Sequence, residues 1–140
     1  MRKEIRPEQV VVREKEVYIA EDGTEFDSKL KCEKYEFDNL KKPLLGNLQR
    51  CKELDDYPNF DGQEYSEWHN YRWYFIRNEE DIDILNRVYG DKIDNSYIGK
   101  WMNVEEDEDA DAWVTTIDDG IRYATAVLTK LGYKVEITKE

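Results

Sequence analysis

The sequence of 140 residues has few cysteines and no long apolar segment. Two cysteines, Cys32 and Cys51, are too few for a disulfide scaffold, and they lack Cys-x-x-Cys spacing. The longest apolar runs, Val17–Ala20 and Trp73–Ile76, have four residues, whereas a membrane-spanning helix needs about 20. Residues 1–7 carry charge with no apolar segment behind them, so no signal peptide is predicted. We therefore expect a cytoplasmic protein with reduced thiols and no membrane contact.

Basic residues are also scarce. Lys and Arg number 21 against 33 Asp and Glu, which gives a net charge of −12. Nucleic-acid and anionic-lipid binders need a basic face, so we do not expect direct nucleic-acid binding. The ten Tyr and four Trp are too many for a disordered chain. Length and composition together predict a folded chain that forms one compact unit.

Residues 1–46 have the pattern of a ββα module. A strand is predicted over 8–20, where four apolar residues stand among polar neighbours: Val10, Val12, Val17 and Ile19. The turn at 21–24 contains Asp-Gly, which favours a tight hairpin, and residues 24–26 pair back. A helix capped by Asp27 or Ser28 follows and ends at Gly46.

Part of this module resembles a known type of segment. The run Tyr18–Phe26, together with Cys32 and Tyr35-Glu36, resembles a segment of small uncharacterised acidic proteins of phages and Gram-positive bacteria. It is also similar to a zinc finger without the paired Cys and His ligands. The resemblance covers only this N-terminal segment. It implies an origin in a mobile genetic element and no particular activity.

Residues 47–67 form a predicted connector, and an aromatic cluster begins within it. Eight of the 18 aromatic residues lie between Tyr57 and Phe75, and His69, the one histidine, lies among them. One interpretation is a ligand pocket with stacking rings and with His69 as an acid or base. The other is a core strand under an aromatic cover, with His69 at its polar edge. The candidate ligand-binding residues are Tyr65, Trp68, His69, Tyr71 and Trp73.

Residues 68–140 predict a βαββαβ domain. Alternation and helical spacing indicate strands at 71–77, 97–104, 112–115 and 133–138 and helices at 79–89 and 117–131. This is the ferredoxin-like order, with both helices on one face of a four-stranded antiparallel sheet. The predicted fold class of the whole chain is therefore α+β.

Negative charge is concentrated in one part of this domain. From Glu79 to Gly120 there are 14 acidic and three basic residues, and Glu105–Asp111 contains six carboxylates in seven residues. One interpretation is a solvated hairpin tip. Another is mimicry of nucleic-acid charge, in which carboxylates occupy the basic channel of a host nuclease or CRISPR effector. The candidate partner-binding residues are Glu79, Glu80, Asp81, Glu105, Glu106, Asp107, Glu108, Asp109 and Asp111.

A calcium site is a third interpretation of the acidic run. Asp107, Asp109, Asp111 and Asp118 stand at positions 1, 3, 5 and 12 of an EF-hand count. Ala112 replaces the glycine needed at position 6, and the last ligand is Asp instead of Glu. We therefore expect no cofactor, with loose binding of Ca²⁺ as the alternative.

The sequence contains no recognisable catalytic motif. A single histidine without a Ser or Cys nucleophile motif, and without a Gly-rich phosphate loop, indicates that the protein is not an enzyme. The leading hypothesis is an acidic, phage-encoded inhibitor that binds a basic host protein. The alternative is a protein that binds or sequesters a small ligand at the aromatic cluster around His69.

Overall fold

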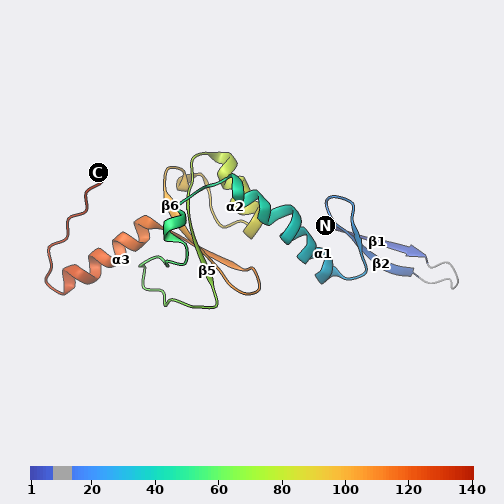
Figure 1. The fold of residues 1–140 in the computed structure, drawn as a ribbon, viewed down its shortest axis with the longest axis horizontal. Helices are drawn as coiled ribbons and strands as arrows, with labels where there is room; N and C mark the ends of the chain where they lie inside the picture. The colour runs from blue at the N-terminus through green and yellow to red at the C-terminus, as the bar shows by residue number, and fades with distance from the viewer. Residues whose placement is uncertain (8–13) are drawn as a thin grey trace. The chain divides into compact units, whose positions relative to one another are not determined.

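The computed structural model describes residues 1–7 and 14–140. The chain divides into two compact units, Met1–Gly46 and Asn47–Glu140, and each is described by itself. Antiparallel sheets and helices occur together in the chain, which confirms the α+β class (Figure 1). Part of the strand predicted over 8–20, including Val10 and Val12, lies outside the described residues.

The first unit contains three strands and a helix. Its antiparallel sheet has the order β1-β2-β3 and is followed by α1; the elements are β1 (Arg2–Pro7), β2 (Glu14–Ile19), β3 (Glu25–Phe26) and α1 (Lys29–Tyr35). Strand β1 was not expected, because its charged residues give no apolar period. Cross-strand ion pairs hold it instead, such as Lys3 Nζ to Glu16 Oε1 at 2.8 Å. Ser28 caps α1 by accepting a hydrogen bond from the Lys31 amide.

Helical turns continue along the chain beyond α1. A π-helical segment, η1 (Glu36–Lys41), and a 3-10 segment, η2 (Lys42–Asn47), replace the single long helix expected from the sequence. The carboxylate of Glu36 is buried and lies 3.0 Å from the Met1 amine. Cys32, which is also buried, belongs to the core of this unit, as expected for a small apolar residue.

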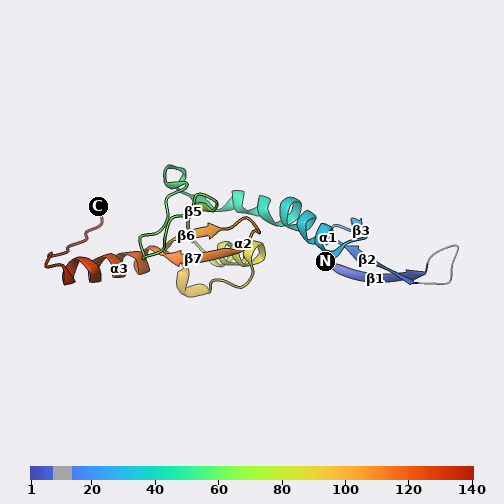
Figure 2. The same cartoon turned by 90° about the horizontal axis from the view of Figure 1, so that it is seen from below.

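The sheet of the second unit does not have the predicted ferredoxin-like topology. Its antiparallel strands follow chain order as β4 (Gln49–Arg50), β5 (Asn70–Phe75), β6 (Trp101–Glu106) and β7 (Ala112–Thr116) (Figure 2). A split βαβ unit would keep β5 and β6 apart, but they pair over their full length. Backbone hydrogen bonds from Ile76 to Lys100 and from Gly99 to Ile76 explain this, because they place the start of β6 beside the end of β5.

The prediction of a last strand at 133–138 is also wrong. Residues 131–140 are all described and contain no strand. The helix before them is α3 (Ile117–Lys130). Thr116 caps it, because its Oγ1 accepts a hydrogen bond from the Asp119 backbone amide. Because no strand returns the chain to the sheet, α3 extends beyond the end of β7 (Figures 1 and 2).

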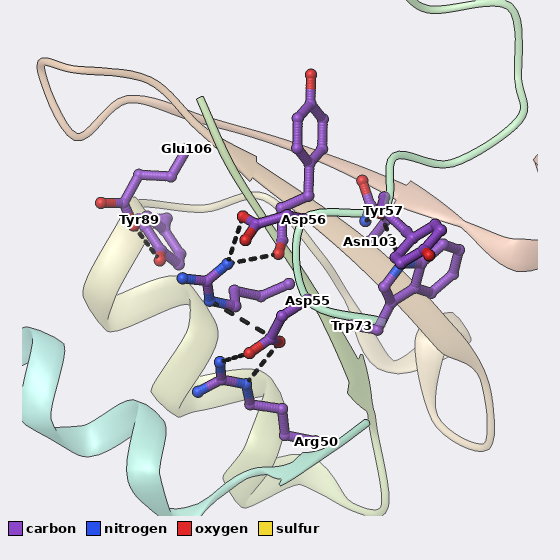
Figure 3. A network of polar contacts seen from close by, with 10 residues as sticks. Arg50, Asp55, Asp56, Tyr57, Trp73, Tyr89, Asn103 and Glu106 are labelled. Carbon is purple, nitrogen blue, oxygen red and sulfur yellow. Dashed lines mark hydrogen bonds and ion pairs between the residues drawn. The ribbon is translucent and has the colours of Figure 1, made fainter. Parts of the chain in front are cut away.

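The other helix of this unit, α2 (Glu79–Tyr89), follows the prediction. Asn78 caps it by accepting a hydrogen bond from the Asp81 amide, and Gly90, with φ of 86°, ends it. Its apolar stripe is buried and consists of Ile82, Leu85 and Val88. The Tyr89 hydroxyl donates a hydrogen bond to Glu106, so α2 covers the sheet face on which Glu106 lies (Figure 3).

The connector covers the opposite face of this sheet. The Tyr57 carbonyl accepts hydrogen bonds from Trp73 Nε1 at 2.9 Å and from Asn103 Nδ2 at 3.2 Å (Figure 3). Further along the connector, the side-chain amide of Asn59 donates a hydrogen bond to the Thr116 carbonyl at the start of α3. The first turn of α3 therefore packs on connector residues, and α3 does not join α2 on one face as predicted.

Arginine–aspartate pairs tie the start of the connector to β5. Arg50 pairs with Asp55 (Figure 3), and Arg72 Nη1 lies 3.1 Å from Asp56 Oδ1. The Asp56 amide also donates a hydrogen bond to the Tyr71 carbonyl. The beginning of the connector is therefore fixed along the edge of β5.

Candidate functional site

The candidate site lies at one end of the second sheet, where β5 begins, β6 ends and β7 begins. The register pairs Tyr71 with Glu105 and Glu105 with Trp113. Paired residues in neighbouring strands point to the same face, so these three side chains form a row on the connector-covered face. We call this region the hairpin end, because the β6–β7 turn closes it.

Glu105 lies in the middle of this row and is 9% exposed. Its Oε1 is 3.6 Å from His69 Nδ1, and it shares a hydrogen bond with the Tyr71 hydroxyl. Burial, together with this hydrogen bond, raises the pKa of Tyr71 to about 12. The same hydroxyl accepts a hydrogen bond from the Ser66 amide at 2.9 Å. Tyr71 therefore joins the connector to a buried carboxylate.

His69 packs against an exposed ring. Its imidazole stacks on Trp113 with ring centroids 5.9 Å apart and an interplanar angle of 19°. Nδ1 is buried and has no hydrogen-bond partner in residues 1–7 and 14–140. An imidazole beside a carboxylate can form an ion pair once it is protonated.

Exposed aromatic rings occur in the same region as this histidine. Tyr65 stacks on Tyr71 at 5.4 Å between ring centroids, while its own ring is largely exposed. Trp68 and Trp113 are also exposed. Trp73, by contrast, is buried and belongs to the core. The structure thus brings Tyr65, His69 and Tyr71 together with Glu105 and Trp113, which the sequence analysis did not assign to the aromatic cluster.

The β6–β7 turn presents carboxylates at the same end of the sheet. Asp107 shapes this turn, because its Oδ1 accepts hydrogen bonds from the Asp109 and Asp111 amides at 2.9 Å each. Ala110 takes the left-handed conformation, with φ of 63°. Glu108 and Asp109 are exposed, and Asp111 lies 3.7 Å from Lys92 Nζ. We call residues 107–111 the acidic tip.

Three of the predicted partner-binding carboxylates are buried, which corrects the expectation that all nine are presented to a partner. Glu105 and Glu106 are each 9% exposed. The Tyr89 hydroxyl donates to Glu106 at 2.6 Å, and burial raises the pKa of that hydroxyl far above its ordinary value. Asp81 is buried as well and accepts hydrogen bonds from the Arg77 amide and guanidinium. These carboxylates therefore support the fold.

The exposed candidates also fall into two groups. Glu79 and Glu80 begin α2, beyond the end of β5 at which Phe75 pairs with Trp101. The acidic tip lies at the other end of the strands. The six residues of β5 span five intervals of about 3.4 Å, so about 17 Å of sheet separates the two groups. They therefore do not form one continuous acidic surface.

The four candidate calcium ligands do not come together. Asp107, Asp109 and Asp111 belong to the acidic tip, whereas Asp118 lies in the first turn of α3 and pairs with Lys100 at 3.1 Å. Strand β7 separates these two places. Within the described part of the chain, no group of three or more His, Cys, Asp or Glu residues is placed to hold a metal ion.

Comparison with known proteins gives no relative from which a role could be transferred. No protein-family model, curated protein or solved structure matches the chain. Among the described residues, no helix has both the length and the apolar character needed to cross a bilayer.

Proposed function

We propose that this chain is an interaction protein that binds a basic partner protein through its hairpin end. One observation carries the proposal: exposed rings and exposed carboxylates share this end of the sheet. Trp113 and Tyr65 supply the rings, and Glu108 and Asp109 of the acidic tip supply the charge. The partner-binding set is therefore smaller than the nine carboxylates expected from the sequence, and it includes aromatic side chains.

Each half of this surface has a distinct role in binding. Tyr and Trp are enriched in interfaces, where buried rings provide much of the affinity. An aromatic face also attracts Lys and Arg side chains by cation–π interaction. Carboxylates steer a basic partner toward the surface and raise the rate of encounter. A cationic segment with Arg or Lys side chains fits both properties.

The charge of the chain supports a basic partner. Residues 47–140 contain 22 acidic and 11 basic residues, whereas residues 1–46 contain 11 and 10. Nearly all of the net charge therefore belongs to the unit that carries the hairpin end. This field repels nucleic acid and attracts the proteins that bind it.

In its more specific form, the proposal is charge mimicry by a protein of mobile-element origin. The partner would be a host nuclease or CRISPR effector in the cytoplasm, whose basic channel normally receives phosphates spaced about 1.7 Å apart along the duplex. The chain would block that channel without a catalytic step of its own. Because Asp81, Glu105 and Glu106 are buried, the acidic tip would enter the channel and the rings would pack at its rim.

Two variants, each lacking two carboxylates at a different end of the sheet, test this proposal. Basic proteins are captured from host lysate at low salt, purified, and measured directly against the chain by biolayer interferometry. The variant Glu108→Ser/Asp109→Ser removes two carboxylates from the acidic tip, and Glu79→Ser/Glu80→Ser removes two from the other end. The first should weaken binding, the second should leave it nearly unchanged, and duplex DNA should compete. Equal losses in the two variants would contradict a site at the hairpin end.

A small ligand at the aromatic cluster is the second candidate function. The observation that favours it is the buried His69 Nδ1, which lacks a hydrogen-bond partner in the described residues and faces Glu105. A ligand with a hydrogen-bond acceptor and an apolar ring could satisfy this nitrogen and stack on Trp113. A thermal-shift screen of small aromatic compounds tests it. Hits should disappear in His69→Ala and persist in Glu108→Ser/Asp109→Ser.

A further inference from the structure

Strand β7 is an open edge of the second sheet. The strand order ends with β7, and no other strand lies beside it in the described part of the chain. Hydrogen-bonded pairs alternate along an antiparallel ladder, and the Asp107 amide donates to the Asp111 carbonyl at the start of this one. Trp113 therefore bonds to β6, whereas Val114 turns its N–H and C=O away from β6. An edge of this kind can accept a further strand.

Nothing in the sequence of β7 protects this edge. Native edge strands are usually protected against pairing by charged residues, proline or a bulge. Strand β7 reads Ala-Trp-Val-Thr-Thr, without charge or proline, and it pairs with β6 without a bulge. Side chains satisfy only its two ends, where the Ala112 amide donates to Asp111 Oδ1 and the Thr116 carbonyl accepts from Asn59 Nδ2. The backbone of Val114, between them, is left for a strand from elsewhere.

The segment after α3 has the sequence of a strand but no sheet to join. We call residues 133–138 the tail. Its apolar residues Tyr133, Val135 and Ile137 alternate with polar ones, which is the pattern of a strand with one buried face. In the single chain this face is not buried, because Tyr133 is 63% and Ile137 59% exposed. The tail therefore has apolar residues spaced for a sheet that its own chain does not provide.

Helix α3 keeps the tail away from β7 of the same chain. The helix starts directly after Thr116, continues in the direction of β7 past the sheet (Figure 2) and rises by about 21 Å over its 14 residues. It ends in a Schellman motif, in which the Tyr133 amide donates to the Leu128 carbonyl and Gly132 has a φ of 92°. Six extended residues cover about 20 Å, so the tail would use its whole length to return to Thr116. It cannot also lie along its own β7.

We propose that the tail pairs with the open edge of β7 in a second copy of this chain, and that the exchange is reciprocal. A copy related by a two-fold axis perpendicular to α3 presents its β7 in the opposite direction. The tail therefore enters at the Thr116 end of that strand and runs antiparallel to it. Exchange of an identical element is a low-cost route to a closed dimer. This dimer does not depend on the proposed function of the hairpin end.

The two faces of the sheet determine the register of the exchanged strand. Ala112 pairs with Glu106, so Ala112 and Val114 lie on the face that α2 covers. Placing Val135 opposite Val114 of the partner subunit, and Ile137 opposite Ala112 of the partner subunit, puts the apolar residues of the tail on this same face. A slip by one residue would turn them to the other face. In this register the outward N–H and C=O of Val114 bond to the backbone of Val135.

Sedimentation equilibrium of the full chain over a concentration series tests the proposal. The mass should rise from 16.8 kDa toward twice that value. Val135→Pro should stay monomeric over the same series, because proline lacks the N–H that bonds to Val114 of the partner subunit. The matched control is Glu136→Pro. Its N–H faces solvent on the outer side of the exchanged strand, where proline is tolerated, so this variant should associate like the unchanged chain.

A disulfide between copies tests the register. In the proposed pairing Lys134 lies opposite Thr115 of the partner subunit in a non-hydrogen-bonded pair, with Cα atoms about 4.5 Å apart, which a disulfide can span. Oxidised Lys134→Cys/Thr115→Cys, in a Cys51→Ser background, should therefore run as a covalent dimer in denaturing electrophoresis. Thr138→Cys/Thr115→Cys is the control, because four residues of strand separate these positions by about 13 Å. The control should stay monomeric.

Three results would overturn the proposal. One is a monomer at every concentration, and another is a dimer that survives Val135→Pro. The third is a Lys134→Cys/Thr115→Cys disulfide that forms within a single chain, because it would show that the tail reaches its own sheet.

Discussion

Asn59 and Gly120 lie so close together that a Cβ atom on Gly120 would stand 2.0 Å from Asn59 Oδ1. Gly120 lies inside α3 with ordinary helical geometry, so space, and not backbone conformation, requires the glycine there. Asn59 is buried, and its Nδ2 donates to the Thr116 carbonyl at 2.9 Å. This contact fixes the connector against the first turn of α3.

Replacing Gly120 by Ala should therefore destabilise the protein. In a helix interior this change normally stabilises by up to about 1 kcal/mol. Here the new methyl group displaces Asn59, and overpacking of this kind costs about 1–3 kcal/mol. Chemical denaturation measures the difference. Gly46→Ala is the control, because a Cβ there meets nothing within 4 Å, and G120A as stable as the unchanged chain would contradict the packing described.

The acidic tip and the buried carboxylate behind it should respond differently to mutation. Glu108→Ser/Asp109→Ser should change the free energy of unfolding by no more than about 0.5 kcal/mol, because both side chains are exposed. Glu105 and Glu106 are buried instead, so replacing either by Ser should lower the free energy of unfolding. A clear fall in melting temperature for the two-site tip variant would mean that the tip is structurally paired.

The hydrogen bond from Tyr89 to Glu106 should contribute measurably to stability. Tyr89→Phe removes a donor from a buried carboxylate, which costs about 1–3 kcal/mol. Urea denaturation of Y89F measures this loss. Tyr133→Phe is the matched control, because Tyr133 is exposed and should tolerate the change. Equal stability of the two variants would show that the Tyr89 hydroxyl contributes little.

Tyr71 should make the fold sensitive to alkali. Burial raises its pKa to about 12, whereas tyrosines of an unfolded chain ionise near 10. The folded state therefore holds this proton more tightly. The resulting stability is fully present below about pH 10 and is lost as the pH rises toward 12. Melting temperatures of the unchanged chain and Tyr71→Phe should converge over this window, and a constant difference would contradict the raised pKa.

Local signals were sufficient to predict α2. Asn78 as the cap, acidic residues in the first turn and Gly90 at the end all act within a few residues of one another. The two-residue alternation of β5 is equally local, and the predicted strand at 71–77 overlaps the observed one at Asn70–Phe75. Two residues of the aromatic cluster, Tyr65 and His69, contact Tyr71 and Glu105 at the hairpin end.

What could not be predicted depends on contacts between distant residues. Glu105 and Glu106 look like members of a solvated acidic run, and only the register with Tyr71 and the position of Tyr89 bury them. The pairing of β6 with β5 depends on the return of the chain to Ile76. The missing last strand leaves Leu131 exposed. Periodicity marks such a residue as apolar but does not identify what covers it.

Binding kinetics should separate the two halves of the hairpin end. Glu108→Ser/Asp109→Ser removes rim charges, so it should slow association by up to about tenfold at low salt and leave dissociation nearly unchanged. The effect should fade at higher salt, since screening acts over about 8 Å at physiological ionic strength. Trp113→Ala removes a packed ring and should mainly speed dissociation. Surface plasmon resonance at several salt concentrations measures both rates. An affinity that salt and both of these variants leave unchanged, but that is lost in His69→Ala, would favour the small-ligand site over the protein interface.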